Sequence, residues 1–299
     1  MVFAIPPLFW ALAAAAGISA WSLLSRHIMR KEKDYLAVAV INENLSALVL
    51  IGALFVLGPA WLSSSQLAAP LDFSSIPLLA WGALAVAIVL YTASGLLSYQ
   101  VFQAVEASER AVVSQAQIVW VVALGALILG EPVGPLTLLA AGLIVAGAVL
   151  CTYRPGKHRW DSPGVRLTLV VALIYCTATL ADKLALGYFP PLLYALPMYL
   201  VPGIAALALL GNSIRKRAPI VLKKYGARFL LFSALSILPY FAYLIALREL
   251  PASSISPLVS TNVVLTALGG MLLLREHEGW RQKIVGALLA FAGAWMMGG

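Results

Sequence analysis

Residues 104–135 read AVEASERAVVSQAQIVWVVALGALILGEPVGP, and residues 249–280 read ELPASSISPLVSTNVVLTALGGMLLLREHEGW. At a fixed offset of 145 residues the two stretches share a Ser-containing start, an apolar run and a short turn that carries a glutamate. The register extends over residues 91–149 and 236–294, and its identical pairs include Ser108 and Ser253, Val119 and Val264, Gly125 and Gly270, Leu129 and Leu274, Glu131 and Glu276, and Gly134 and Gly279. Self-similarity at a fixed offset predicts a duplicated structural unit.

The composition places both copies in a membrane. Of the 299 residues, 62% are hydrophobic and 11% are charged, against about 25% charged in soluble domains. A hydrocarbon core of about 30 Å needs roughly 20 apolar residues per helix. Ten stretches meet this need, and we predict an all-α membrane protein with ten transmembrane helices at 7–25, 35–58, 76–103, 110–129, 135–153, 165–186, 192–211, 228–247, 254–274 and 280–298. The first stretch lacks a basic start, so we expect a permanent helix rather than a cleaved signal peptide.

The chain has a net charge of +8, and membrane insertion explains the distribution of its basic residues better than nucleic-acid binding does. Lys and Arg cluster after every second predicted helix, and Arg110 is counted in the cluster that follows the third. The positive-inside rule makes these loops cytoplasmic, so both termini are predicted on the outer, periplasmic side of a bacterial inner membrane. Lys183, near a span end, is treated as the only Lys or Arg inside a span, because Arg110 and the other basic residues at span starts are counted with the cytoplasmic loops.

The sequence offers no motif for catalysis or for a cofactor. Cys151 and Cys176 lie in apolar helix sequence, where a thiol usually behaves as a small hydrophobic group. The three histidines show no metal-ligand spacing, and no Walker loop or hydrolase motif occurs. We therefore expect no metal, no cofactor and no enzymatic activity.

A unit of five helices is odd-numbered, so its second copy must cross the membrane in the opposite direction. The domains are predicted as a first repeat at 1–153, a cytoplasmic linker at 154–164 and a second repeat at 165–299. Two inverted repeats around a central cavity suit alternating access, in which the halves exchange inward-open and outward-open shapes. The alternative is that duplication left symmetry without transport.

The repeated end of each unit carries a family resemblance. ALILGEPVGPLTLLAAGLIVAGAVL and GMLLLREHEGWRQKIVGALLAFAGAWM each join an apolar run, a Gly-Glu or Arg-Glu turn and a Gly-rich final helix. Nearly the whole chain resembles the ten-helix exporters of the drug/metabolite transporter superfamily, built from two EamA-type repeats. It looks closest to the bacterial aromatic amino acid exporters of the YddG type. This resemblance implies a secondary transporter and a small-molecule substrate.

Polar side chains share one face on several predicted helices, as their 100° angular step shows. Ser114 and Gln117 lie on such a stripe in the fourth helix, and Asn262 and Thr266 lie on its counterpart in the ninth. The predicted solute-binding residues are Ser22, Glu43, Tyr91, Ser98, Tyr99, Ser114, Gln117, Tyr175, Thr179, Ser236, Tyr240, Tyr243, Asn262 and Thr266. Interhelical hydrogen bonding and close packing are the structural alternative for the same stripes.

Two carboxylates lie inside predicted spans. Glu43, in AVINENLSAL (39–48), is about 12 Å from the helix end and too deep to reach the interface easily. It either binds the amino group of a zwitterion, carries a proton for antiport, or holds helices together as a hydrogen-bonded acid. Asp182 is a second candidate for proton coupling, although near the outer helix end a solvated charge is its default interpretation. The predicted hinge or gate residues are Gly125, Pro197, Pro239, Pro257 and Gly270.

A polar cavity without a buried cation disfavours phosphorylated substrates, which need Lys or Arg. We therefore expect export of small zwitterionic metabolites, foremost aromatic and other apolar amino acids. The first alternative is a multidrug exporter of quaternary cations held by Glu43 and tyrosines. The second is a membrane scaffold or receptor without transport. The expected partners are amino acids and the lipid bilayer, with no nucleic acid, and we expect a monomer while leaving a dimer open.

Overall fold

The computed structural model describes residues 7–62, 76–129, 133–153, 162–189, 191–209, 211–249 and 252–298, and their regular structure is entirely helical. The helices are α1 (Pro7–Met29), α2 (Tyr35–Leu62), α3 (Leu78–Ala104), α4 (Ala107–Val113), α5 (Ala116–Leu129), α6 (Pro135–Thr152), α7 (Pro163–Leu186), α8 (Pro191–Leu209), α9 (Gly211–Tyr225), α10 (Arg228–Glu249), α11 (Ala252–Leu274) and α12 (Trp280–Gly298).

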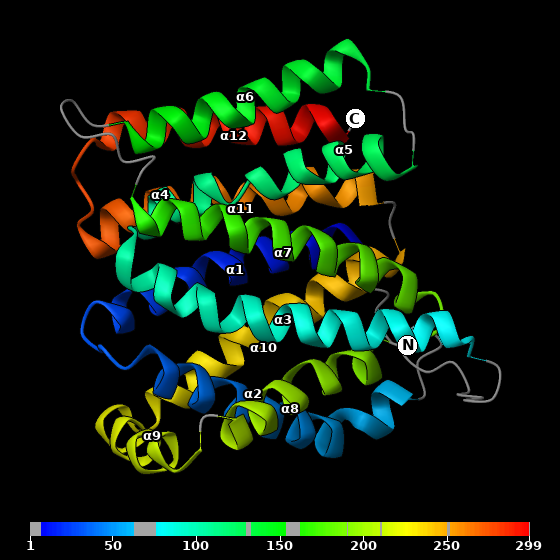
Figure 1. The fold of residues 1–299 in the computed structure, drawn as a ribbon, viewed down its shortest axis with the longest axis vertical. Coiled ribbons are helices and arrows are strands. Elements are labelled where there is room, and N and C mark those ends of the chain that lie inside the picture. The colour runs from blue at the N-terminus through cyan, green and yellow to red at the C-terminus, as the bar shows by residue number, and fades with distance from the viewer. Residues whose placement is uncertain are drawn as a thin grey trace.

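Most helices lie roughly side by side in one bundle, with α6 and α12 along one edge and α2, α8 and α9 along the other (Figure 1). The packing pairs include α6 with α12, α3 with α7, and α1 with α10. Glycines allow the first of these pairs to approach closely, since a Cβ on Gly147 would lie 2.5 Å from the carbonyl oxygen of Gly286. The start of α1 and the end of α12 lie at the same end of the bundle.

Six described helices are long and apolar enough to cross a membrane, or seven if the bent pair α8 and α9 counts as one span. Large apolar side chains face outward on them; Leu78 is 87% exposed and Leu138 is 62% exposed. Such exposure is costly in water and favourable in lipid. The count of ten spans remains a prediction, and the predicted helix at 110–129 is wrong as a single helix, because it is divided into α4 and α5 around Ser114 and Gln115.

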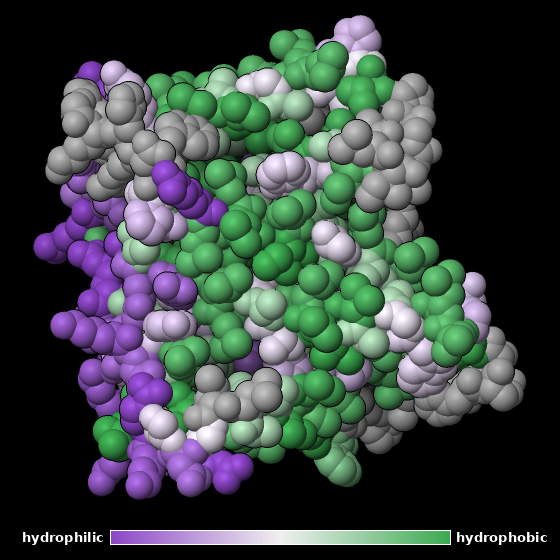
Figure 2. Space-filling model, viewed as in Figure 1, coloured by the Kyte–Doolittle hydropathy of each residue, from purple (hydrophilic) through white to green (hydrophobic). Residues whose placement is uncertain are grey.

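On the face shown in Figure 2, hydrophilic residues gather over one end of the bundle as a hydrophilic cap, and mainly apolar residues cover the described surface beside it. The cap includes α9, a helix where the sequence predicts a loop, so this expectation is wrong. The helix bends away from the described part of α8 by 117°. Arg217 pairs with Asp34 at 2.8 Å, and Lys224 pairs with Glu32 at 2.8 Å, so α9 is tied to the segment between α1 and α2.

At the same end, a buried polar cluster joins α1, α4 and the turn between α11 and α12; we call it the Glu276 latch. The Glu276 carboxylate is 5% exposed and accepts from the Ala107 N–H at 3.0 Å. It also accepts from the Ser108 N–H at 3.2 Å and the Ser108 hydroxyl at 2.8 Å. The Arg26 guanidinium lies 3.6 Å away. Lys283 donates to Glu106 and to the Glu276 carbonyl, which completes the latch.

Candidate functional site

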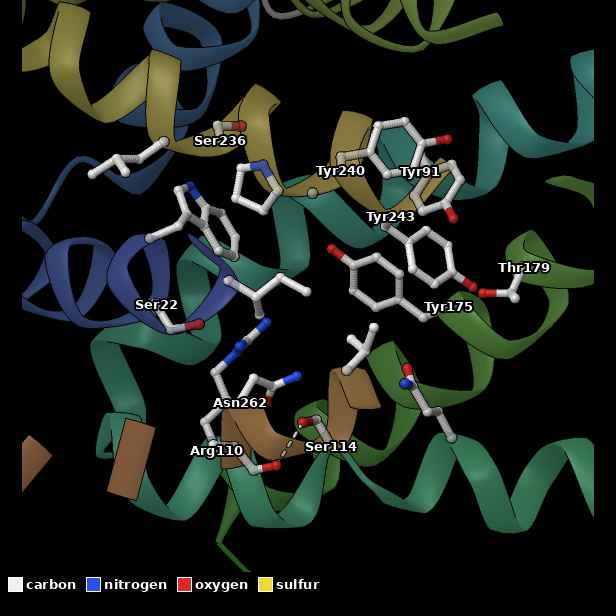
Figure 3. Close-up of a pocket in the computed structure, with 18 of the residues that line it drawn as sticks. Ser22, Tyr91, Arg110, Ser114, Tyr175, Thr179, Ser236, Tyr240, Tyr243 and Asn262 are labelled. Carbon is white, nitrogen blue, oxygen red and sulfur yellow. Dashed lines mark hydrogen bonds between the residues drawn. The ribbon is translucent and has the colours of Figure 1, made fainter. Parts of the chain in front are cut away.

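A cavity of about 280 Å³ lies among α1, α2, α3, α4, α5, α7, α8, α10 and α11. This size is near the lower end of ligand pockets, which run from about 300 to 1,000 Å³. Figure 3 shows labelled polar side chains from these helices pointing toward a common space. The cavity is therefore shared between elements from both halves of the chain.

Twelve of the fourteen predicted solute-binding residues line this cavity: Ser22, Glu43, Tyr91, Tyr99, Ser114, Gln117, Tyr175, Thr179, Ser236, Tyr240, Tyr243 and Asn262. The other two are buried in the packing between helices, with Ser98 0% exposed and Thr266 1% exposed, and neither is part of the lining. The position of the twelve is observed, and binding by them remains a prediction. For Ser98 and Thr266, too, a role in solute binding remains a prediction.

The break between α4 and α5 turns polar groups toward the cavity. Ser114 caps the last turn of α4 by donating its hydroxyl to the Ala111 carbonyl at 2.9 Å. Gln115 accepts from the Ser260 hydroxyl at 3.2 Å, which joins two residues separated by the repeat offset of 145. The Gln115 and Ser260 side chains are 4% exposed, and Gln115 contributes to the lining although the sequence stripe excluded it.

Tyrosines form an aromatic wall on one side of the cavity. Tyr91 packs edge-on against Tyr175, with ring centroids 5.7 Å apart, and against Tyr240 at 5.6 Å. Tyr199 packs on Tyr240 at 6.1 Å and donates its hydroxyl to the Ser236 carbonyl at 3.0 Å. Tyr199 was missed, although its position inside an apolar helix is the same signal that identified Tyr240. The wall presents both ring faces and hydroxyl groups to a solute.

Asp182 supports this wall from behind. Tyr91 donates to one carboxylate oxygen at 2.5 Å, and Tyr194 donates to the other at 2.6 Å. Asp182 is 0% exposed, so its default interpretation as a solvated charge at a helix end is wrong. The two hydroxyl donors replace water around a carboxylate that the packing has buried. Asp182 does not line the cavity, and it reaches the site through Tyr91.

The polar stretch Asn42, Glu43 and Asn44 divides into two structural residues and one cavity residue. Asn42 is 0% exposed and donates to the Ser236 hydroxyl at 3.2 Å. Asn44 donates to the Val40 carbonyl at 2.8 Å and to the Gly203 carbonyl at 3.2 Å. Only the Glu43 carboxylate lines the cavity, opposite Gly95, where a Cβ would lie 3.6 Å from Glu43 Oε1.

Arg110 also lines the cavity, which contradicts its predicted place in a cytoplasmic loop. Its side chain is 8% exposed, and its guanidinium lies 4.2 Å from the Phe102 ring centroid. The expectation that Lys183 alone would lie within a span is therefore wrong. The cause is the short helix α4, which folds the start of the predicted fourth span into the protein. With Arg110 in its lining, the cavity contains a cation that can pair with an anionic group, so anionic substrates are no longer disfavoured.

The predicted hinge residues lie in helices with different surroundings. Pro239 lines the cavity within α10, and a Cβ on Gly17 would lie 2.5 Å from its ring. Pro197 lies inside α8. A Cβ on Gly270 would lie 2.7 Å from Glu276 Oε2, so this glycine leaves room for the latch. Gly125 and Pro257 fall within α5 and α11, but their side-chain surroundings are outside the described residues.

The described residues contain no group of three or more His, Cys, Asp or Glu side chains that could hold a metal ion. The chemistry available at the cavity is instead hydrogen bonding by tyrosines, serines and amides, one carboxylate, one guanidinium and aromatic stacking. This set can bind a small amphipathic molecule.

Comparisons with known proteins agree with this architecture. A solved structure, described only as a crystal structure of a protein, matches at a TM-score of 0.60 and 15% identity, covering 97% of this chain and 94% of its own. That likeness concerns the fold alone. No curated protein matches the chain. The EamA-like transporter family matches it over residues 5–153 and again over 162–299. The chain is thus a multi-pass membrane protein that belongs to the EamA-like transporter family.

Proposed function

We propose that this protein is a secondary transporter that exports small zwitterionic metabolites from a bacterial cell, foremost aromatic and other apolar amino acids. The observation that carries the proposal is the composition of the cavity. Tyrosine rings can hold an apolar or aromatic side chain, while the amides of Gln117 and Asn262 and the Glu43 carboxylate can hold polar groups. Family membership supports transport, and the cavity chemistry supports the substrate class.

The proposed mechanism is alternating access by two inverted five-helix repeats in a ten-span bundle. Three observations support it. The family matches each half of the chain separately. The packing pairs correspond between halves, since α1 packs on α10 and α11 as α7 packs on α3 and α5. In Figure 1, α1 and α7 run in opposite directions along the bundle.

The proposed orientation puts the hydrophilic cap in the cytoplasm and both termini in the periplasm. The cap contains the basic helix α9, and the positive-inside rule favours basic segments on the cytoplasmic side. The start of α1 and the end of α12 lie at the opposite end of the bundle, which supports outer termini. The Glu276 latch would then close the cytoplasmic end of the cavity.

The second candidate function is export of organic cations, because Glu43 and the tyrosine wall together resemble an anionic aromatic cage. Arg110 disfavours this candidate. A fixed guanidinium in the same cavity repels a substrate that carries only positive charge.

Counterflow into proteoliposomes tests the proposal. Vesicles loaded with unlabelled L-tryptophan or L-phenylalanine should accumulate the labelled amino acid transiently, whereas vesicles loaded with a quaternary amine should not. We expect Gln117→Leu and Tyr243→Ala each to slow counterflow about tenfold, the effect of losing one contact worth about 1.4 kcal/mol. Counterflow of quaternary amines alone would favour the second candidate, and no counterflow of any solute would favour a scaffold or receptor.

Replacing Glu43 with Gln separates two roles for this carboxylate. If Glu43 carries the coupling proton, Glu43→Gln should abolish the response of transport to a pH gradient while exchange of substrate across the membrane continues. If Glu43 binds the substrate ammonium, the same variant should raise the substrate concentration for half-maximal exchange. The measurement is uptake with and without an imposed pH gradient. Unchanged gradient dependence in the variant rules out the proton role.

A further inference from the structure

Arg110 is a buried cation, and its partners among the described residues are aromatic rings. Its guanidinium carbon lies 4.2 Å from the Phe102 ring centroid and 5.9 Å from the Trp21 ring centroid. Cation–π contacts engage the flat face of a guanidinium and leave its N–H groups, which point outward in the plane, available. In Figure 3 the side chain extends from α4 toward the space that Ser22 and Asn262 also face.

The carboxylates of the latch and of α7 are held by other groups. Glu106 pairs with Lys283, and Glu276 is held by Ala107, Ser108 and Arg26. Asp182 accepts from two tyrosines. In the part of the chain that the structure describes, no carboxylate forms an ion pair with Arg110. Burying a guanidinium at this depth costs free energy unless an anion or water contacts it. The cavity beside Arg110 has room for such an anion.

The charge of Arg110 has no counterpart at the equivalent position of the second repeat. At the offset of 145 residues, the position that corresponds to Arg110 is Ile255, which is 1% exposed and lies in an apolar cluster. A cation that the helix packing needed for both halves would be matched by a polar residue there. The Arg110 charge is therefore a feature that the two repeats do not share.

We propose that Arg110 anchors the carboxylate of the transported solute, an assignment that rests on the proposed function and specifies how its substrate class is recognised. The planar N–H pair of a guanidinium matches the two oxygens of a carboxylate, which gives a directed, charge-assisted contact. Glu43 in the same lining then faces the ammonium, and the tyrosine wall receives the apolar side chain.

Three ligands that differ by one charged group test this assignment on the purified protein in detergent: L-phenylalanine, 3-phenylpropionate, which lacks the ammonium, and phenethylamine, which lacks the carboxylate. Isothermal titration should give about 10- to 100-fold weaker binding of the first two to Arg110→Met, the usual effect of losing hydrogen bonds to a charged group. Phenethylamine should bind this variant as tightly as the parent, or more tightly. The affinities of Arg110→Lys for the two carboxylate ligands should fall between those of the parent and Arg110→Met, because lysine keeps the charge and lacks the paired N–H groups of the guanidinium.

Arg215→Met is the matched control, because Arg215 lies exposed on α9 and the same substitution there should leave all three affinities unchanged. A thermal melt of each variant shows whether it is folded, and Arg110→Lys keeps the test valid if Arg110→Met unfolds. Equal weakening of all three ligands overturns the assignment of Arg110, and so does unchanged binding of L-phenylalanine and 3-phenylpropionate. In either case, binding of L-phenylalanine by the parent protein still supports the proposed function. Tighter binding of phenyl phosphate than of 3-phenylpropionate also overturns it, in favour of a phosphate site. A parent protein that binds only phenethylamine, or none of the ligands, contradicts both proposals.

Discussion

Replacing Glu276 with Ala should open one end of the transporter to the aqueous phase. The substitution removes the acceptor of two backbone N–H groups and one hydroxyl, and it removes the partner of Arg26. Leaving a buried charge and buried donors unpaired costs about 3 kcal/mol or more. Since a shift of 1.4 kcal/mol changes an equilibrium tenfold, the population in which the latch is open should rise by about two orders of magnitude.

A cysteine introduced into the cavity reports this opening. In inside-out membrane vesicles that carry Ser22→Cys, a membrane-impermeant maleimide reaches the protein from the cytoplasmic side. It should label the introduced thiol at least about tenfold faster when Glu276→Ala is added, because Ser22 is 3% exposed and lines the cavity. Mass spectrometry of the labelled peptide separates this site from the buried Cys151 and Cys176. Glu276→Gln should give a smaller effect, since an amide oxygen keeps one acceptor.

His277→Ala is the control for the latch, because His277 lies exposed in the same turn. It should leave the labelling rate unchanged. If Glu276→Ala labels no faster than its Ser22→Cys parent while its melting temperature stays the same, the latch does not close the cavity. The closure would then have to lie elsewhere in the bundle.

The cavity could be predicted from sequence because its lining follows helical periodicity. Gln117 and Asn262 are equivalent in the repeat, and both line the site. Glycine and serine on the same stripes indicated a face turned away from lipid, which is a property of single helices and so readable from the chain. Tyrosines far from helix ends gave a similar signal. These residues shared one requirement, that the polar face of a helix avoid lipid.

Arg110 and the basic segment 211–225 could not be placed in this way. The rule that assigns Arg to cytoplasmic loops acts on insertion, and it does not register a helix break that turns a loop residue into the cavity. The break falls at Ser114 and Gln115, and neither residue is a glycine or proline that would mark it. For α9, the ion pairs from Arg217 and Lys224 to the segment between α1 and α2 are tertiary contacts, and no local pattern reveals them.

Asp182 presents the same limitation, since its hydrogen-bond donors are far from it in sequence. Its position near a helix end suggested solvent, but Tyr91 from α3 and Tyr194 from α8 close over it. The carboxylate joins three helices, and through Tyr91 it fixes the ring that packs on Tyr175 and Tyr240. Its contribution is therefore both to stability and to the shape of the cavity wall.

Asp182→Leu should be the most damaging single substitution behind that wall. It leaves two tyrosine hydroxyls without their acceptor at a site that is 0% exposed, and each buried unpaired group costs about 1–3 kcal/mol. Unfolding by SDS in mixed micelles should show a loss of about 3 kcal/mol. Counterflow should fall at least about tenfold as Tyr91 loses its fixed position.

Graded variants separate the carboxylate's structural role from a role in proton coupling. Asp182→Asn should lose less stability than Asp182→Leu, because its carbonyl can still accept one hydroxyl. Tyr194→Phe should lose about 1 kcal/mol with transport largely kept, since Tyr194 does not line the cavity. Thr177→Val on α7 is the control and should change neither quantity, because among the described residues the Thr177 hydroxyl bonds the Leu173 carbonyl of its own helix. If Asp182→Leu is as stable as the parent, the tyrosine hydroxyls have found other acceptors. The structural role of the carboxylate would then be rejected.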